Sequence, residues 1–169
     1  NGPAITVYDT DKEFKPENCL FFFRTQTKKY AVESSNINGM SIQDYDHEIE
    51  RYLNNAKWAL EILKSHNVKR AAIEGYSMGS KAGLLCQISE NTAMIKERMY
   101  LNKIAFETPS PSQIKKFFTE NGRADKEMMV STFKFTTKYD LQKTLETSKF
   151  YSKPIEDVVD SYAICKWLV

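Results

Sequence analysis

The segment Arg70-Ala71-Ala72-Ile73-Glu74-Gly75-Tyr76 stands between two stretches with helical periodicity. Apolar residues recur every three or four positions over residues 44–66 and again over residues 81–100, and this spacing is typical of amphipathic helices. The segment itself is short, apolar before Glu74 and followed by glycine, which predicts a buried strand. A strand that is joined to its neighbours through helices on both sides is the repeating unit of α/β folds.

The rest of the chain extends this pattern. Short apolar or aromatic runs predict further strands, and periodic stretches and Pro154, which suits the first turn of a helix, predict further helices. We expect strands at residues 4–8, 19–25, 29–33 and 103–106, and helices at residues 112–119, 124–133 and from 154 to the C-terminus. The first three strands are close in sequence, which predicts an antiparallel hairpin or meander. The order predicts an α/β fold in which helices flank a mixed sheet.

The composition is that of an ordinary globular domain. The 169 residues include 24 Lys and Arg against 22 Asp and Glu, which gives a net charge of +2. This length fits a single domain over residues 1–169, and no apolar run approaches the roughly 18 residues of a membrane span. No signal peptide is visible, so we expect a cytoplasmic protein that binds no membrane. Cys19, Cys86 and Cys165 are far apart, which predicts free thiols rather than zinc ligands or disulfides.

The segment Gly75-Tyr76-Ser77-Met78-Gly79 matches the G-x-S-x-G nucleophile motif of α/β-hydrolases. In that fold the histidine that serves as general base follows the serine in the sequence. Here both histidines, His47 and His66, precede Ser77. The motif therefore lacks its base in the expected order, and serine-hydrolase chemistry is an alternative that labelling of Ser77 with a covalent serine probe would test.

Three acidic residues suggest a different chemistry. Glu74 ends an apolar strand, and Asp157 and Asp160 are three positions apart, which places them on one face of the last predicted helix. Glu74 could simply reach solvent at the strand end, and Asp157 could serve the helix N-terminus. Asp160 is harder to explain in this way, because its neighbours are apolar and a buried carboxylate needs a partner. Such acids are the minimum for a Mg²⁺ site that cleaves phosphodiesters.

At this point the sequence resembles the RuvC-type Holliday-junction resolvases, and most closely the phage-type members of this group within the RNase H-like nuclease superfamily. The resemblance spans residues 2–168 and consists of five stretches in the same order. They are Ala72-Ile73-Glu74 followed by an aromatic residue, residues 77–83 with 89–92, Pro111-Ser112-Gln113-Ile114-Lys115-Lys116-Phe117, Gly122-Arg123-Ala124-Asp125-Lys126-Glu127 and Asp157-Val158-Val159-Asp160-Ser161-Tyr162-Ala163.

The resemblance implies a fold and an activity. The fold would be an RNase H-like mixed five-stranded sheet flanked by helices, and the activity would be metal-dependent resolution of four-way junctions or other branched DNA. Glu74, Asp157 and Asp160 would be the metal ligands, for two Mg²⁺ or Mn²⁺ ions per site. The resemblance further implies a homodimer, for which we take residues 81–100 as the candidate seam, and a host cell cytoplasm as the location if a bacteriophage encodes the chain.

The resemblance also implies which residues contact DNA. Lys115 and Lys126 match lysines that contact the scissile backbone, so Lys126 also counts as a catalytic candidate. The family has an aromatic residue shortly after the second acid that stacks at the junction centre, and Tyr76 is its nearest match here, with a spacing that differs by one position. Taken alone, Lys115, Lys116, Arg123 and Lys126 would be expected on a solvated helix face. Beside three candidate metal ligands, we expect them to form a basic strip that holds phosphates.

One family feature has no obvious counterpart. The family's first acid ends the first strand, before an Asn-Gly, Thr-Gly or Ser-Gly pair, and this chain begins with Asn1-Gly2. We therefore expect the first strand and its aspartate to lie upstream of residue 1, with Asp9 as the alternative. Absence of this acid would favour a rival function, a branched-DNA-binding protein without cleavage activity. A nucleotide-binding, actin-like or kinase-type member of the superfamily is disfavoured, because no G-x-x-x-x-G-K-(S/T) loop occurs.

Overall fold

The computed structural model describes residues 2–76, 82–147 and 149–169. The chain, for which the sequence predicts one domain, divides into two compact units. The first unit comprises residues 1–42, 112–167 and 169, and the second unit comprises residues 43–111 and 168. Ser77, the candidate nucleophile of the serine-hydrolase alternative, lies outside the described residues.

The sheet of the first unit has the strand order β1-β2-β3. β1 (Ala4–Tyr8) pairs with β2 (Cys19–Thr25) in antiparallel register, from Ala4 opposite Phe23 to Tyr8 opposite Cys19, which confirms the predicted hairpin. β3 (Ile37–Ser41) lies parallel to β2.

The predicted strand over residues 29–33 is wrong. Lys28–Tyr30 forms a 3₁₀ turn, η2, and Glu33 makes only an isolated bridge to Asn38. Because β2 and β3 are parallel, the chain has to return from the end of β2 to its beginning before β3 can start. Residues 26–36 make this return, so they cannot extend the sheet.

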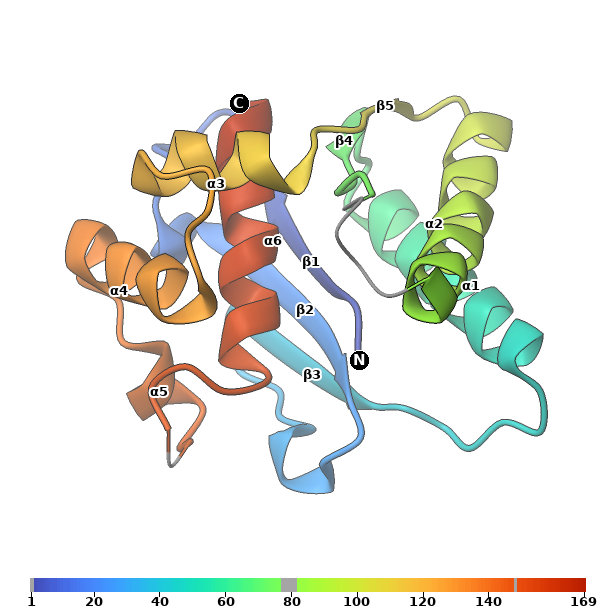
Figure 1. Ribbon diagram of the computed structural model, residues 1–169, viewed down its shortest axis with the longest axis horizontal. Helices are drawn as coiled ribbons and strands as arrows, with labels where there is room; N and C mark the ends of the chain where they lie inside the picture. Colours follow the sequence, from blue (N-terminus) through green and yellow to red (C-terminus); the bar gives the residue numbers. More distant parts are fainter. Residues whose placement is uncertain (1, 77–81, 148) are drawn as a thin grey trace. The chain divides into compact units, whose positions relative to one another are not determined.

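The helices of the first unit are α3 (Pro111–Thr119), α4 (Lys126–Thr137), α5 (Leu141–Thr144) and α6 (Ile155–Leu168). α6 lies against the sheet (Figure 1), where the hydroxyl groups of Thr6 and Ser161 are 2.8 Å apart. In β2 the alternate residues Cys19, Phe21 and Phe23 are fully buried, as expected for a strand with one face on the core.

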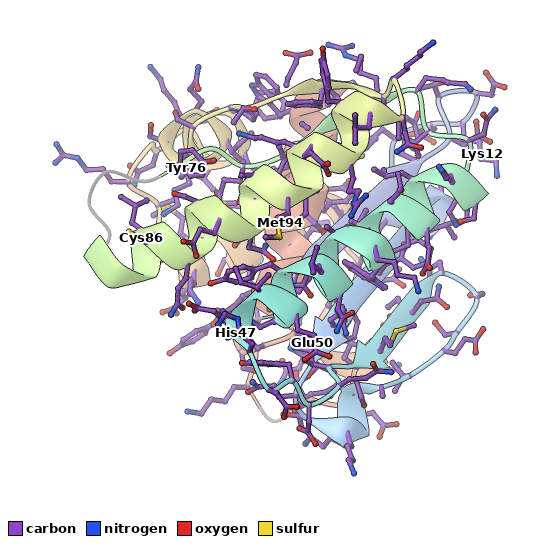
Figure 2. All side chains as sticks on the ribbon, turned by 90° about the vertical axis from the view of Figure 1, so that its right-hand side faces the viewer. Lys12, His47, Glu50, Tyr76, Cys86 and Met94 are labelled. Carbon is purple, nitrogen blue, oxygen red and sulfur yellow. The ribbon has the colours of Figure 1, made fainter. Side chains whose placement is uncertain are left out.

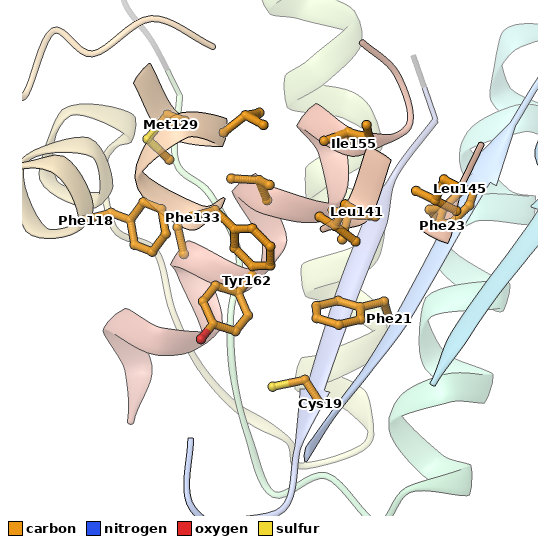
Figure 3. Close-up of a cluster of buried hydrophobic side chains, with 14 of the residues drawn as sticks. Cys19, Phe21, Phe23, Phe118, Met129, Phe133, Leu141, Leu145, Ile155 and Tyr162 are labelled. Atoms are coloured by element: carbon orange, nitrogen blue, oxygen red, sulfur yellow. The ribbon is translucent and has the colours of Figure 1, made fainter. Parts of the chain in front are cut away.

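Tyr162 of α6 lies at the centre of this core (Figure 3). Its ring centroid is 4.9 Å from that of Phe133 and 6.2 Å from those of Phe21 and Phe118. One side chain of α6 thus contacts rings from β2, α3 and α4. This packing fixes the helix that carries Asp157 and Asp160.

The second unit is built on two long helices, α1 (Glu48–Ser65) and α2 (Ala82–Leu101), which lie side by side in Figure 2. Leu63, Met99 and Ile104 form its small apolar cluster. The amide of Asn55 donates to the side-chain oxygen of Asn91 at 2.9 Å, which joins the two helices by a polar contact. β4 (Arg70–Ala72) pairs in parallel with β5 (Ala105–Glu107).

The fold class is the expected mixed α/β arrangement with flanking helices. The arrangement of the strands differs, because the described strands form a three-stranded sheet in the first unit and a two-stranded sheet in the second rather than one continuous sheet. The three cysteines are free thiols, as predicted. Among the described residues, no helix combines the length and the apolar composition that crossing a membrane requires.

Candidate active site

Asp157 and Asp160 lie in the N-terminal half of α6. The helix begins after Pro154, whose carbonyl accepts a hydrogen bond from the Val158 N–H at 3.1 Å. Val158 and Val159 are fully buried in the core, and both aspartates are partly exposed. The apolar residues of α6 therefore face the core, while the spacing of three brings the two carboxylates to one side of the helix.

Asp157 is the more constrained of the two carboxylates. Only 20% of its side chain is exposed, and burial raises its pKa above the ordinary value, against the opposing effect of Lys153 and Lys126. The ammonium of Lys153 is 3.2 Å from Oδ1 of Asp157. A carboxylate whose pKa stays raised despite two lysines is incompletely compensated, so an additional cation near it would be stabilised.

Lys126 begins α4 and reaches the first turn of α6. The preceding Asp125 is the N-cap of α4, and its carboxylate accepts a hydrogen bond from the Met128 N–H at 2.8 Å. The ammonium of Lys126 donates to the carboxylate of Glu156. Partial burial lowers the pKa of Lys126, but the hydrogen bond to Glu156 and the charges of Glu156, Asp157 and Asp160 raise it more, so the net shift is upward.

Glu156 is the residue of this cluster that the sequence analysis missed. Its side chain is 11% exposed, although it is a carboxylate. The available signal was a second acid directly before Asp157 in the first turn, four positions before Asp160. Its partner Lys126 is 30 positions away in the sequence, so only the packing of α4 against α6 reveals the pair.

The other members of the predicted basic strip also belong to the first unit. α3 is amphipathic: Ile114 and Phe118 are buried, whereas Lys115 is partly exposed and Lys116 is exposed. Arg123 is exposed in the loop before α4. At Gly122 an added Cβ would lie 3.3 Å from the carbonyl oxygen of Ser112, so this loop packs closely on the start of α3. The strip residues thus come from adjoining segments.

Glu74 and Tyr76 belong to the second unit, whereas Asp157 and Asp160 belong to the first. Both residues are exposed and follow the end of β4. The Gly75 N–H donates to the carbonyl of Pro109 at 2.8 Å, so this segment continues beside the one that follows β5. The ammonium of Lys96 lies 5.0 Å from the ring centroid of Tyr76.

Asp9, the alternative first acid, lies in an exposed turn after β1. Its carboxylate accepts a hydrogen bond from the Asp11 N–H at 3.2 Å. In Figure 1, β1 and α6 run in the same direction, so the end of β1 that precedes Asp9 lies toward the C-terminal end of α6, which carries Cys165. Cys165 is two helical turns beyond Asp157, about 12 Å along the axis. Asp9 is therefore at the other end of α6 from Asp157, which argues against it as the missing acid.

The donor chemistry of the α6 pair fits a hard divalent cation. Within residues 2–76, 82–147 and 149–169, no group of three His, Cys, Asp or Glu side chains is arranged to hold a metal ion. Mg²⁺, however, is often bound by one or two carboxylates together with water and substrate phosphates. Asp157 and Asp160 supply two such carboxylates, and the three-acid group with Glu74 stays a prediction.

Comparison with known proteins gives similarity in structure but not in sequence. No protein-family model and no curated protein matches the chain. A structure of Thermus thermophilus RuvC has a TM-score of 0.58 and 13% sequence identity, covering 96% of this chain and 82% of RuvC. T. thermophilus RuvC in complex with a Holliday junction substrate has a TM-score of 0.53 and 16% identity, over 73% of this chain and 68% of that one. The chain therefore has a RuvC-like fold.

Proposed function

We propose that this protein is a metal-dependent endonuclease that cleaves branched DNA, with the four-way junction as its preferred substrate. One observation carries the proposal: on a RuvC-like fold, the partly buried pair Asp157 and Asp160 lies beside two lysine ammonium groups, those of Lys126 and Lys153. Carboxylates that bind a cation next to ammonium groups that bind phosphate are what phosphodiester hydrolysis requires. One structural neighbour is a complex with a Holliday junction substrate, which supports branched DNA as the substrate class.

The proposed roles follow from the chemistry of each side chain. Asp157 and Asp160 would hold Mg²⁺ or Mn²⁺, which when bound would activate water and stabilise the leaving oxygen. Lys126 would donate to the scissile phosphate. Lys115, Lys116 and Arg123 would neutralise the neighbouring backbone, which positions the DNA without reading its sequence. Glu74 is proposed as a third metal ligand, and the complete site would hold two metal ions. Tyr76 is proposed to stack on a DNA base.

Resolution of a junction requires cuts in two strands, which a homodimer would supply through two equivalent sites. We keep residues 81–100, which include most of α2, as the proposed seam. Several α2 side chains within the described residues are exposed, among them Cys86, Ile88 and Tyr100. Sedimentation of the free protein over a range of concentrations tests the dimer independently of cleavage.

The deciding experiment compares a synthetic four-way junction with linear duplex, with and without Mg²⁺. We expect Mg²⁺-dependent cutting of the junction and little cutting of the duplex. Asp160→Asn should abolish cutting while leaving junction binding nearly intact, because the DNA is held mainly by the basic strip. Asp11→Asn makes the same change at an exposed turn and should have no effect. Equal cutting of junction and duplex would refute junction specificity.

A second function is binding of branched DNA without cleavage, which the same fold and basic strip would support even if the acids held no metal ion. Glu74→Gln separates the two functions. In a nuclease that uses Glu74 as a ligand, this substitution should eliminate cutting and preserve binding. If the unaltered protein binds junctions but cuts none with either Mg²⁺ or Mn²⁺, the binding function is the correct one.

A further inference from the structure

The carboxylate of the Lys126–Glu156 ion pair is more buried than that of the other ion pairs described in the first unit, of which Lys153–Asp157, with a carboxylate 20% exposed, comes nearest. In the pairs Lys12–Asp9, Lys15–Glu13 and Lys134–Asp140, both side chains are at least 39% exposed. In the Lys126–Glu156 pair the carboxylate is 11% exposed and the lysine is 62% exposed. The carboxylate is thus a fixed, buried anchor, while the lysine reaches toward it from the surface.

A buried carboxylate is costly unless it is compensated by a close partner. In the sequence of α6, Glu156 stands among the buried residues Ile155, Val158 and Val159. Its first-turn position in α6 favours a negative charge, because the helix N-terminus carries partial positive charge. Both the helix and Lys126 therefore stabilise a charged Glu156 at this place.

Lys126 is held at both of its ends. Its backbone begins α4, where the Asp125 cap fixes the first turn. Its ammonium is fixed by Glu156, although a lysine stem with four carbons would otherwise sample many rotamers. An ammonium group has three N–H donors, and the contact with Glu156 uses one of them. The remaining donors stay available in the field of Asp157 and Asp160.

We infer that Glu156 is a positioning residue, which holds the ammonium of Lys126 beside the Asp157–Asp160 pair so that Lys126 meets the scissile phosphate without reorganisation. This inference rests on the proposed nuclease function. Holding a catalytic group in place before the substrate arrives lowers the cost of reaching the reactive geometry. Glu156 acts only through Lys126 and does not itself contact DNA.

The pairing itself can be tested without cleavage, by ¹H–¹⁵N NMR of the lysine ammonium groups. Ammonium protons exchange rapidly with water unless a partner holds them, so Lys126 should give a sharp signal that Lys126→Arg removes. Glu156→Gln should broaden or abolish that signal. Glu127→Gln also removes one negative charge, at the exposed position next to Lys126, and should leave the Lys126 signal unchanged. A Lys126 signal that is equally sharp in Glu156→Gln would overturn the inference.

Single-turnover cleavage of a four-way junction tests the role in function. Glu156→Gln should slow cleavage at least tenfold without weakening junction binding, because the substitution removes a negative charge near the DNA. Glu156→Asp keeps the charge and should restore part of the rate, which also guards against a folding defect in the Gln variant. Glu127→Gln should cleave at the normal rate.

A double-mutant cycle separates positioning from an independent role. In a Lys126→Met background, Glu156→Gln should cause no further loss of rate, because the lysine that it positions is gone. An undiminished further loss would show that Glu156 acts by another route and would overturn the inference. If the unaltered protein cuts no junction, the proposed function fails and the inference falls with it. If the unaltered protein cuts and Glu156→Gln cuts equally well, the inference alone fails.

Discussion

Replacing Phe133 by alanine should destabilise the first unit severely. Phe133 is 1% exposed, and its ring meets that of Tyr162 edge to face at 4.9 Å and an interplanar angle of 88°. Truncation of a buried Phe costs about 3–5 kcal/mol, since transfer energy is lost and a cavity remains. The aromatic contact accounts for about 0.5–1.5 kcal/mol of this loss. For a chain of this size, the melting temperature should fall by roughly 6–20 °C.

The matched control is Phe135→Ala, the same substitution two positions along α4. Phe135 is 75% exposed, and the Lys138 ammonium lies 4.3 Å from its ring centroid. An exposed cation–π contact contributes at most about 1 kcal/mol, so this variant should unfold almost like the unaltered protein. Urea unfolding followed by circular dichroism measures both free energies. Equal losses for the two variants would refute the packing of α4 against α6 described above.

Two further predictions concern charge and thiol chemistry. The hydrogen bond from Lys134 lowers the pKa of Asp140 below its ordinary value of 3.8. The stabilisation is therefore present above that value and disappears as the pH falls through the lowered pKa. Asp140→Asn, which can still cap α5, should lower the free energy of unfolding by a few tenths of a kcal/mol at neutral pH and leave it unchanged in strong acid. A difference in unfolding free energy that does not change with pH would contradict this. Burial raises the pKa of Cys19 and Cys165 to about 12, whereas Cys86 is exposed. A thiol reagent should modify Cys86 rapidly and the other two only on unfolding, and mass spectrometry that finds Cys19 or Cys165 labelled in the native protein would refute their burial.

The long helices could be predicted closely because their periodicity is strong. The helix expected over residues 44–66 is observed as Glu48–Ser65. It begins later because the side chain of His47 accepts a hydrogen bond from the Ile49 N–H at 3.2 Å and so caps the helix. Single-residue capping of this kind depends on side-chain geometry, which periodicity does not report.

β3 was missed for a specific physical reason. It contains Asn38-Gly39, a pair that normally signals a turn. Here a Cβ at position 39 would collide with the carbonyl oxygen of Tyr30 and with the ring of Phe23. The glycine is therefore needed for a close approach inside a strand rather than for a turn. Local sequence carries no information about that approach, because its partners come from other segments.

The candidate site was predictable to the extent that it is local. The spacing of Asp157 and Asp160 along one helix was enough to place them together on α6. The contact between Lys126 and Glu156 joins two helices, and the sequence contains no pattern that links them. Likewise, the argument against Asp9 depends on which end of α6 the β1 turn adjoins.

The location of Tyr162, one helical turn beyond Val158 and Val159, has a consequence for how the site can respond to a ligand. The same α6 that carries the two aspartates also supplies Val158, Val159, Tyr162 and other fully buried residues to the core of the first unit. Its backbone amides should therefore exchange with solvent deuterium only when the whole unit opens. The carboxylates, with Lys126 held beside them by Glu156, are then a rigid template, and any adjustment to an incoming backbone phosphate has to come from the exposed side chains of Lys116 and Arg123.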